Sequence, residues 1–219
     1  MKPRFSHQRN QALTLFETIV VIAVLAVALA MILPALAKAK RRSSKINCAS
    51  NIKQIGISFR LWEGDHDGKY PMSVSVTTGG AMESAATGDV VPTFQVMSNE
   101  LSTPKILLCP VDTDRSYATN FASGFTAKNI SYFVGLDVST NSPQTFLSGD
   151  DNFAIGGVPV KSGLLQLLTN DPIAWTAARH KFVGNIGLAD GSVCWKTDAK
   201  SLVEKLQATG VATNRLAIP

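Results

Sequence analysis

Residues 12–37 read ALTLFETIVVIAVLAVALAMILPALA, and this stretch decides the architecture of the chain. No charged residue occurs from Ile19 to Leu36, and only Thr18 and Pro34 interrupt the apolar character around it. Glu17 lies just before the uncharged run. An ionised side chain inside a bilayer costs about 2.5–3.5 kcal/mol at the helix centre, so an acid in this place indicates a function.

The apolar run is long enough to cross a membrane. Residues 13–33 would form a helix of about 31 Å at a rise of 1.5 Å per residue, which matches the hydrocarbon core of a bilayer. A basic leader with Lys2, Arg4 and Arg9 precedes the run. The sequence therefore predicts one membrane-crossing helix near the N-terminus.

Three kinds of precursor carry such a segment. It could be a plain membrane anchor, or a secretory signal peptide cut after Ala35-Leu36-Ala37, which has the required small residues. In the third kind, cleavage precedes the apolar run, which stays in the product as an assembly helix. Signal-peptide cores usually have 7–15 apolar residues and no acid, so the length of the run and Glu17 favour the third kind.

The block from Ala12 to Glu17 resembles the type IV prepilin motif, in which a glutamate is the fifth residue after the cleavage site. Counting from Leu13, Pro34 falls at position 22, where this family commonly has a helix-bending proline. The chain has Ala12 where pilins usually have glycine, and Leu13 where phenylalanine is common. The resemblance implies a leader of residues 1–12, cleavage between Ala12 and Leu13 by a prepilin peptidase, and N-methylation of Leu13.

The same resemblance implies a role for Glu17 in filament assembly. Cleavage would expose a positively charged amino group on Leu13. In a filament, the carboxylate of Glu17 would be buried beside the terminal ammonium of a neighbouring subunit, and each would be strongly unfavourable without the other. Packed helices would therefore adopt the register that pairs them.

Length and charge restrict the remaining functions. Of the 219 residues, about 180 lie outside the apolar segment, which is enough for one domain with its own core. The net charge of +5 falls to +2 without residues 1–12, since 18 basic and 16 acidic residues then remain. This balance argues against nucleic acid as a partner. Five basic residues between Lys38 and Lys45 indicate contact with lipid headgroups.

The helix is expected to continue past this basic patch. One apolar stripe recurs every three or four residues, and its members are Ile46, Ala49, Ile52, Ile55, Phe59 and Trp62. The stop signal begins at Gly64. A helix from Thr14 to about Glu63 would be about 75 Å long, and Pro34 should kink it.

The rest of the chain predicts a small antiparallel sheet. Residues 73–88 have the composition of a loop, and a helix is expected near Thr93–Ser102. Strands are expected at Lys105–Cys109, Ser131–Leu136, Thr145–Leu147 and Phe153–Ile155. Asp190-Gly191 predicts the turn of a hairpin between Asn185–Ala189 and Ser192–Lys196, and residues 198–208 should form a closing helix. The fold class is α+β: a long kinked helix, its first half transmembrane, packed on a small antiparallel sheet.

A second resemblance covers most of the remaining chain. Its elements are Asn51-Ile52-Lys53-Gln54-Ile55-Gly56, Leu61-Trp62, Asp65 to Pro71, Cys109-Pro110, and His180 followed after nine residues by Asp190-Gly191. They look like a bacterial group of prepilin-type proteins with an H-x9-DG region, related to the major pseudopilins of type II secretion. This similarity implies an assembly segment at 13–37, an amphipathic helix at 38–64 and a globular domain at 65–219.

The three cysteines, Cys48, Cys109 and Cys194, lack the CxxC spacing of common zinc sites, which argues against zinc. A disulfide between Cys48 and Cys109 is the favoured pairing if the domain lies outside the cytoplasm. The alternative is three buried thiols.

Other candidate sites have structural alternatives. His180 and Asp190 could be a catalytic or metal pair, but a histidine at the start of a hairpin with Asp190-Gly191 in its turn is favoured. Oxygen ligands for calcium could come from Asp112, Asp114, Asp150 and Asp151, although the alternative of solvated turn acids is favoured. Motifs of nucleophilic hydrolases, zinc proteases and P-loops are absent from the sequence, and a Cys109–His180 pair was the remaining catalytic combination.

These observations predict a structural subunit of a pilus-like filament, specifically a type II secretion pseudopilin, and not an enzyme. Its partners would be copies of itself and other pilins, the prepilin peptidase, a platform protein and an assembly ATPase. It would span the inner membrane once with the leader in the cytoplasm and the domain in the periplasm, although the basic patch then lies on the side that the positive-inside rule disfavours. The alternatives are a type IV pilin for adhesion or DNA uptake, and an exported or anchored binding protein or enzyme.

Overall fold

The computed structural model describes residues 14–219, and these divide into two compact units. The first unit ends at Ser43 and the second comprises Ser44–Pro219. The boundary falls inside helix α1, Leu15–Gly64. The amphipathic part of this helix therefore belongs to the globular unit. The boundary between the units, after Ser43, lies between the two domain boundaries predicted after residues 37 and 64. Ala12 and Leu13, the predicted cleavage and methylation residues, lie outside the described residues.

The first turn of α1 is closed by two side chains. Glu17 accepts hydrogen bonds of 2.8 Å from both the backbone N–H and the hydroxyl of Thr14, and Thr14 Oγ1 accepts one of 3.3 Å from the backbone N–H of Glu17. This is the reciprocal capping box of a Thr-x-x-Glu sequence. The acid that marks the apolar run therefore also fixes where the helix begins.

Among residues 14–43, no other element covers the apolar part of α1. The helix continues through Pro34, and the large apolar side chains from Leu15 to Leu36 are exposed. By length and composition, this is the one described helix that could cross a membrane, and none of its most apolar window is buried. A long exposed apolar surface in water is unfavourable.

The part of α1 in the second unit buries one stripe, as the periodicity predicted. Ile52, Ile55, Phe59 and Trp62 are almost completely buried. The N-terminal end of the stripe differs from the prediction because Ile46 is exposed and Cys48 takes the buried position. The helix ends at Gly64, and Asp67 and Gly68 in the turn that follows have left-handed backbone angles.

A six-stranded antiparallel sheet lies at the centre of the second unit. Its order is β5-β9-β1-β2-β7-β8. The strands are β1 (Tyr132–Gly135), β2 (Phe146–Asp150), β5 (Gly163–Leu168), β7 (Gly184–Leu188), β8 (Val193–Thr197) and β9 (Thr213–Ile218). The last strand of the chain, β9, lies between β5 and β1 and pairs with both. The sequence predicted β1, the start of β2 and the hairpin β7–β8, but not β5 or β9.

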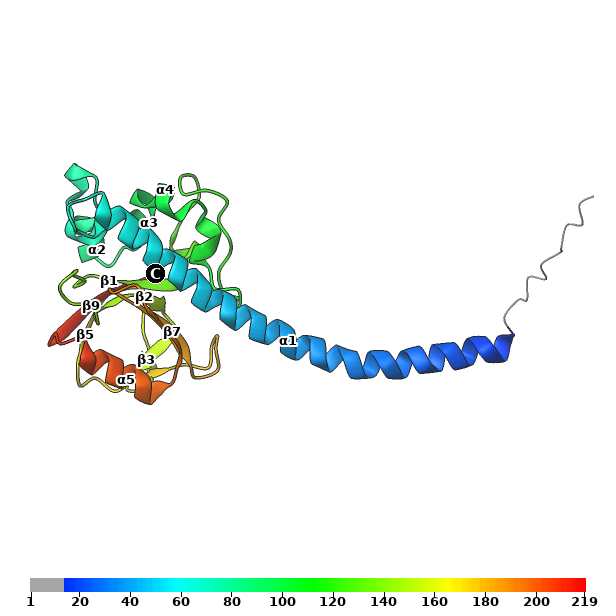
Figure 1. The fold of residues 1–219 in the computed structure, drawn as a ribbon. Coiled ribbons are helices and arrows are strands. Elements are labelled where there is room, and N and C mark those ends of the chain that lie inside the picture. The colour runs from blue at the N-terminus through cyan, green and yellow to red at the C-terminus, as the bar shows by residue number, and fades with distance from the viewer. Residues whose placement is uncertain (1–13) are drawn as a thin grey trace, which may run out of the picture. The chain divides into compact units, whose positions relative to one another are not determined.

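Two layers cover the central sheet (Figure 1). On one side lie the second part of α1 and the short helices that follow it, with Ile55 and Phe94 in a common apolar core. On the other side lie α5 (Ala199–Ala208) and a three-stranded sheet ordered β4-β3-β6, with Phe133 and Leu206 in a second core. The three strands are β3 (Phe153–Ile155), β4 (Val158–Pro159) and β6 (Ile173–Trp175).

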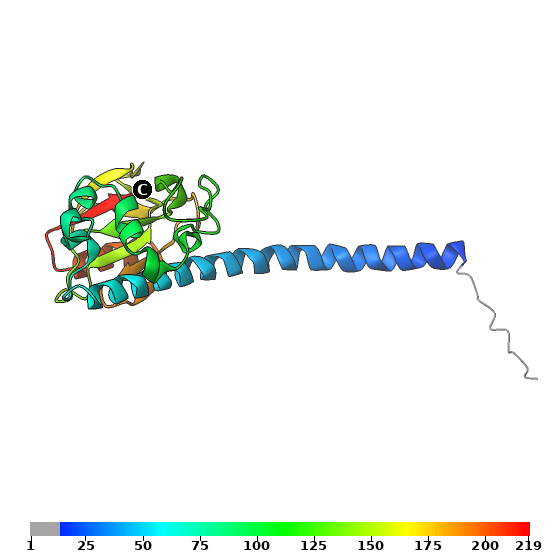
Figure 2. The ribbon, with the colours of Figure 1, turned by 90° about the horizontal axis from the view of Figure 1, so that it is seen from above.

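The segment between α1 and β1 contains short helices and no strand among its described residues. This corrects three predictions: the loop at residues 73–88, the helix at Thr93–Ser102 and the strand at Lys105–Cys109. The view in Figure 2 shows these helices beside the last, cyan turns of α1. Their bounds are η1 (Pro71–Ser73), η2 (Val76–Thr78), α2 (Met82–Ala86), α3 (Val91–Val96), α4 (Ser98–Leu101), η3 (Pro104–Leu107) and η4 (Ala127–Asn129).

The strand predicted at Lys105–Cys109 is wrong, since Pro104 starts the 3-10 helix η3 there with its fixed φ angle. The helix predicted at Thr93–Ser102 is divided into α3 and α4 at Met97. Short apolar runs do not distinguish strand from helix by periodicity alone.

Candidate functional site

Four side chains from distant parts of the sequence meet in the interior of the second unit. We refer to them as the Cys–His–Asp cluster: Cys48, Cys109, Asp150 and His180. Their sulfur, nitrogen and carboxylate oxygen atoms all lie within 4.8 Å of one another. All four residues are at most 2% exposed. The cluster therefore concentrates two thiols, an imidazole and a carboxylate in a place without bulk water.

The side chains of the cluster contact one another. His180 Nε2 lies 3.3 Å from Cys109 Sγ, 3.3 Å from Cys48 Sγ and 3.5 Å from Asp150 Oδ2. The thiol of Cys48 also donates to Asp150 Oδ1 at 3.2 Å. One ring nitrogen thus faces three potential ligand or hydrogen-bonding atoms at once, which is more than a single N–H group satisfies.

Each member of the cluster is positioned by a different element. Cys48 lies on α1, Cys109 follows η3, Asp150 ends β2, and His180 precedes β7. Because these elements belong to both the helical layer and the central sheet, the cluster lies where the two layers meet. It depends on the complete fold of the second unit.

Neighbouring groups hold the carboxylate and one thiol in place. Asp150 Oδ2 accepts hydrogen bonds of 2.8 Å from both the backbone N–H and the side-chain amide of Asn185. The hydroxyl of Tyr132 lies 3.2 Å from Cys48 Sγ, and the Asn51 amide lies 3.5 Å from that hydroxyl. Such outer contacts orient the groups they touch.

The backbone around His180 is tightly constrained. Lys45 Nζ donates to the His180 carbonyl at 3.3 Å. The next two residues, Lys181 and Phe182, have φ angles of 56° and 62°, in the left-handed region that is unfavourable for side chains larger than glycine. The N–H of Phe182 donates to the Thr176 carbonyl at 3.2 Å, which closes this reversal. The fold therefore accepts local strain where it turns His180 inward.

The cluster strongly perturbs its ionisable groups. Burial raises the pKa of Cys48, whereas its hydrogen bond to Cys109 lowers the pKa of the Cys109 thiol to about 6. For His180, burial favours the neutral ring, but hydrogen bonds with Asp150 and Cys109 outweigh it and raise the pKa to about 9. Burial also raises the pKa of Tyr132. Perturbed groups gathered in one place indicate a functional or metal-binding site.

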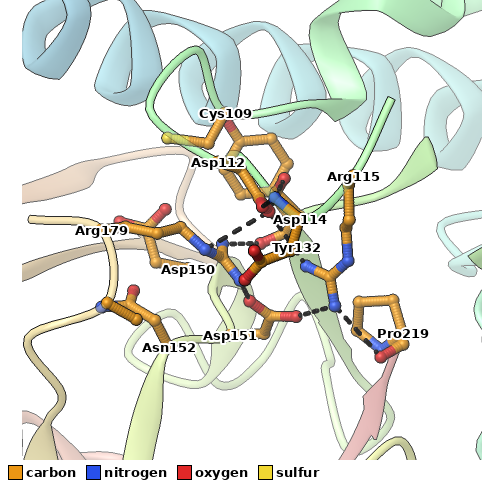
Figure 3. A network of polar contacts seen from close by, with 12 residues as sticks. Cys109, Asp112, Asp114, Arg115, Tyr132, Asp150, Asp151, Asn152, Arg179 and Pro219 are labelled. Atoms are coloured by element: carbon orange, nitrogen blue, oxygen red, sulfur yellow. Dashed lines mark hydrogen bonds and ion pairs between the residues drawn. The ribbon is translucent and has the colours of Figure 1, made fainter. Parts of the chain in front are cut away.

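Beside this cluster lies a second polar group, the Arg–Asp network, which consists of Asp112, Arg115, Asp151 and Arg179 (Figure 3). Arg115 contacts Asp112 at 3.3 Å and Asp151 at 2.7 Å, and Arg179 pairs with the same two carboxylates. Both carboxylates are 3% exposed. Two positive and two negative charges thus compensate each other in the interior.

This arrangement separates the four predicted calcium ligands. Asp112 and Asp151 are paired with arginines, Asp150 belongs to the Cys–His–Asp cluster, and Asp114 is exposed. Arginine guanidinium groups occupy the places that a calcium ion would need beside the first two carboxylates. Among the described residues, these four acids do not share one ligand shell.

The two ends of the H-x9-DG region have different roles. Asp190 and Gly191 form the turn of the β7–β8 hairpin, with Asp190 Oδ1 accepting from the N–H of Ser192 at 2.7 Å and Gly191 at a φ of 80°. His180 belongs to the Cys–His–Asp cluster, and no contact described for residues 14–219 joins it to Asp190. The catalytic or metal pair of these two residues is thus not formed.

Two pairings considered from the sequence come together here. Cys48 and Cys109 are neighbours, as the favoured disulfide required, but both are free thiols in the structure. Cys109 and His180 are also in contact. Sequence reasoning did not include Asp150 with these residues. The argument against zinc from the missing CxxC spacing does not apply to ligands contributed by four separate segments.

Comparisons of the chain with models of protein families, with curated proteins and with solved structures find no match.

Proposed function

We propose that the protein is a structural subunit of a pilus-like filament, specifically a pseudopilin of the type II secretion type. The observation that carries the proposal is the exposed apolar part of α1, which bears one acid, Glu17, in its first turn. A plain anchor could also use Glu17 to close its first turn. In a filament the carboxylate would have a second role, because an acid buried between packed helices is strongly unfavourable without a partner charge.

The capping box is consistent with a retained helix. Thr14 and Glu17 close the start of α1 directly after the predicted cleavage site. A processed chain beginning at Leu13 would place its terminal ammonium one residue before this cap. The carboxylate would then be available to its own first turn in the membrane and to a neighbouring ammonium in the filament.

The second unit supports a role as a subunit exposed to solvent. It has its own cores on both faces of the central sheet, and the second part of α1 is one of its elements. One continuous helix would therefore join the assembly segment to the folded unit. Packing of the apolar segments in a filament would then incorporate the attached folded units. The proposed partners are copies of this chain, related pilins, the prepilin peptidase, the platform protein and the assembly ATPase.

The N-terminus of the mature protein tests the proposal. The chain would be expressed with a prepilin peptidase in a bacterial host, recovered from membranes and sequenced from its amino end by mass spectrometry. We expect methylated Leu13. An N-terminus at Lys38 would show that the apolar segment is a removed signal peptide, and an intact Met1 in the presence of active peptidase would show a plain anchor. Both outcomes would refute the proposed function.

A further inference from the structure

The Cys–His–Asp cluster has the composition and spacing of a metal site. A tetrahedral zinc ion with bonds of 2.0–2.3 Å separates its ligand atoms by about 3.3–3.8 Å. Four contacts in the cluster are 3.2–3.5 Å long, close to this range, although they use both oxygens of Asp150. One ligand atom from each of the four residues lies within 4.8 Å of the other three. We propose that Cys48, Cys109, Asp150 and His180 bind one zinc ion.

The ligand types select the metal. Thiolates are soft ligands that favour zinc over calcium or magnesium, and imidazole and carboxylate oxygen also suit zinc. A compact set of two sulfurs, one nitrogen and one oxygen therefore favours zinc over a hard cation. This differs from the calcium site considered as an alternative for the acidic residues, and it uses only one of them, Asp150.

The surrounding contacts compensate the charge of a bound ion. Two thiolates and one carboxylate carry three negative charges, so a zinc ion leaves a net charge of −1. Asn185 donates two hydrogen bonds to Asp150, and Tyr132 is placed to donate one to the sulfur of Cys48. Donors of this kind delocalise ligand charge and fix ligand orientation around metal ions.

The number and burial of the ligands assign a structural role to this ion. Structural zinc sites have four protein ligands, whereas catalytic sites keep one position open for water or substrate. Here four protein ligands are present and all are buried. The ion would join α1 to β2 and to the segments before β1 and β7, and it would stabilise the folded second unit by binding that state alone.

The competing occupant is a Cys48–Cys109 disulfide. Its formation would release one proton from each thiol, pass two electrons to an external oxidant and eliminate both thiolate ligands. The geometry favours zinc, because a disulfide would use only the two sulfur atoms. The convergence of His180 and Asp150 on those sulfurs would then have no role. The two occupants exclude each other, so one measurement separates them.

The test uses the full chain purified in detergent without chelators. Elemental analysis by mass spectrometry should find about one zinc per chain. The double variant Cys48→Ser/Cys109→Ser should bind zinc at least about tenfold more weakly, because loss even of an outer contact costs 10–100-fold in affinity. Cys194→Ser is the matched control, because Cys194 lies outside the cluster, and it should retain one zinc per chain.

Cobalt provides a readout that does not depend on the folding of variants. The unaltered chain, stripped of metal and loaded with Co²⁺, should show thiolate-to-cobalt charge-transfer absorption and the strong visible bands of a tetrahedral site. Absence of zinc from the unaltered, reduced chain after incubation with zinc would overturn the proposal. So would a Cys48–Cys109-linked peptide in the native protein, or full zinc retention in the double variant. None of these outcomes bears on filament assembly.

Discussion

The ammonium group of Lys53 donates a hydrogen bond of 2.6 Å to the backbone carbonyl of Gly191, which joins α1 to the turn between β7 and β8. Arg60 and Tyr70 both donate to the carbonyl of Ala189 in the same turn, each at 3.3 Å. The end of the H-x9-DG region is thus fastened to α1, while its histidine contacts Cys48 on the same helix. The region acts as a two-point attachment of β7 to α1.

Asp190 should make this attachment sensitive to acid. Hydrogen bonds from Ser192 hold the pKa of Asp190 below its usual value of 3.8. Its contribution to stability is therefore present above about pH 4 and lost as the pH falls through the folded-state pKa. Asp190→Ala should cost about 0.5–1.5 kcal/mol at pH 7, the net value of one hydrogen bond.

Urea unfolding followed by tryptophan fluorescence at several pH values measures this effect. The difference between the unaltered chain and Asp190→Ala should shrink below pH 4. Asp190→Asn is the control, since it keeps a hydrogen-bond acceptor but does not titrate. A difference that stays constant from pH 7 to pH 3 would contradict the assigned role.

The Arg–Asp network should be far more sensitive to substitution than the surface ion pairs. Asp151→Ala leaves Arg115 and Arg179 with one carboxylate between them, and breaking a buried pair costs about 3–5 kcal/mol. The control is Glu204→Ala, because the Lys200–Glu204 pair is largely exposed and such helix pairs contribute about 0.3–0.5 kcal/mol. Chemical denaturation measures the free energy of unfolding of both variants. Equal losses would show that the network contributes no more to stability than an exposed ion pair.

Two glycines should respond to alanine in opposite directions. A Cβ atom at Gly135 in β1 would overlap the carbonyl oxygen of Phe146, so Gly135→Ala must displace the β1–β2 backbone and should cost at least about 1–3 kcal/mol. At Gly56 in α1 a Cβ meets no atom within 4 Å, and Gly56→Ala should stabilise by about 0.5–1 kcal/mol through helix propensity. Thermal unfolding measures both signs, and a stabilising Gly135→Ala would contradict the strand pairing.

Glu17 should be required for assembly but not for membrane insertion. Glu17→Ala removes both the partner of the terminal ammonium and the helix cap, and an unpaired buried charge costs about 3–5 kcal/mol. Filament yield should fall at least about tenfold, measured by shearing and immunoblotting, while the membrane fraction keeps the protein.

Glu17→Gln separates the two roles, because glutamine at this position can still close a capping box but carries no charge. It should fail to assemble as Glu17→Ala does. If Glu17→Gln filaments form normally, then the carboxylate acts through the cap of α1 and the charge pairing proposed for assembly is wrong.

The sequence by itself determined those features that depend on neighbouring residues. The apolar run gives the exposed part of α1, and the repeat of Ile52, Ile55 and Phe59 gives its buried stripe, since both are properties of a helix with 3.6 residues per turn. Asp190-Gly191 gave the hairpin because only a few residues suit such a turn. The Thr14-x-x-Glu17 capping box likewise depends only on residues three apart in the sequence.

Only the tertiary structure decided the Cys–His–Asp cluster. Cys109 and His180 are 71 residues apart, and Cys48 and His180 are 132 apart, so no local spacing signals their contact. The cluster forms because α1 packs on a sheet whose strand order brings β2 beside β7, which places Asp150 next to the segment before β7. Sequence motifs detect ligands held by one short segment, whereas this set is assembled by the packing of layers.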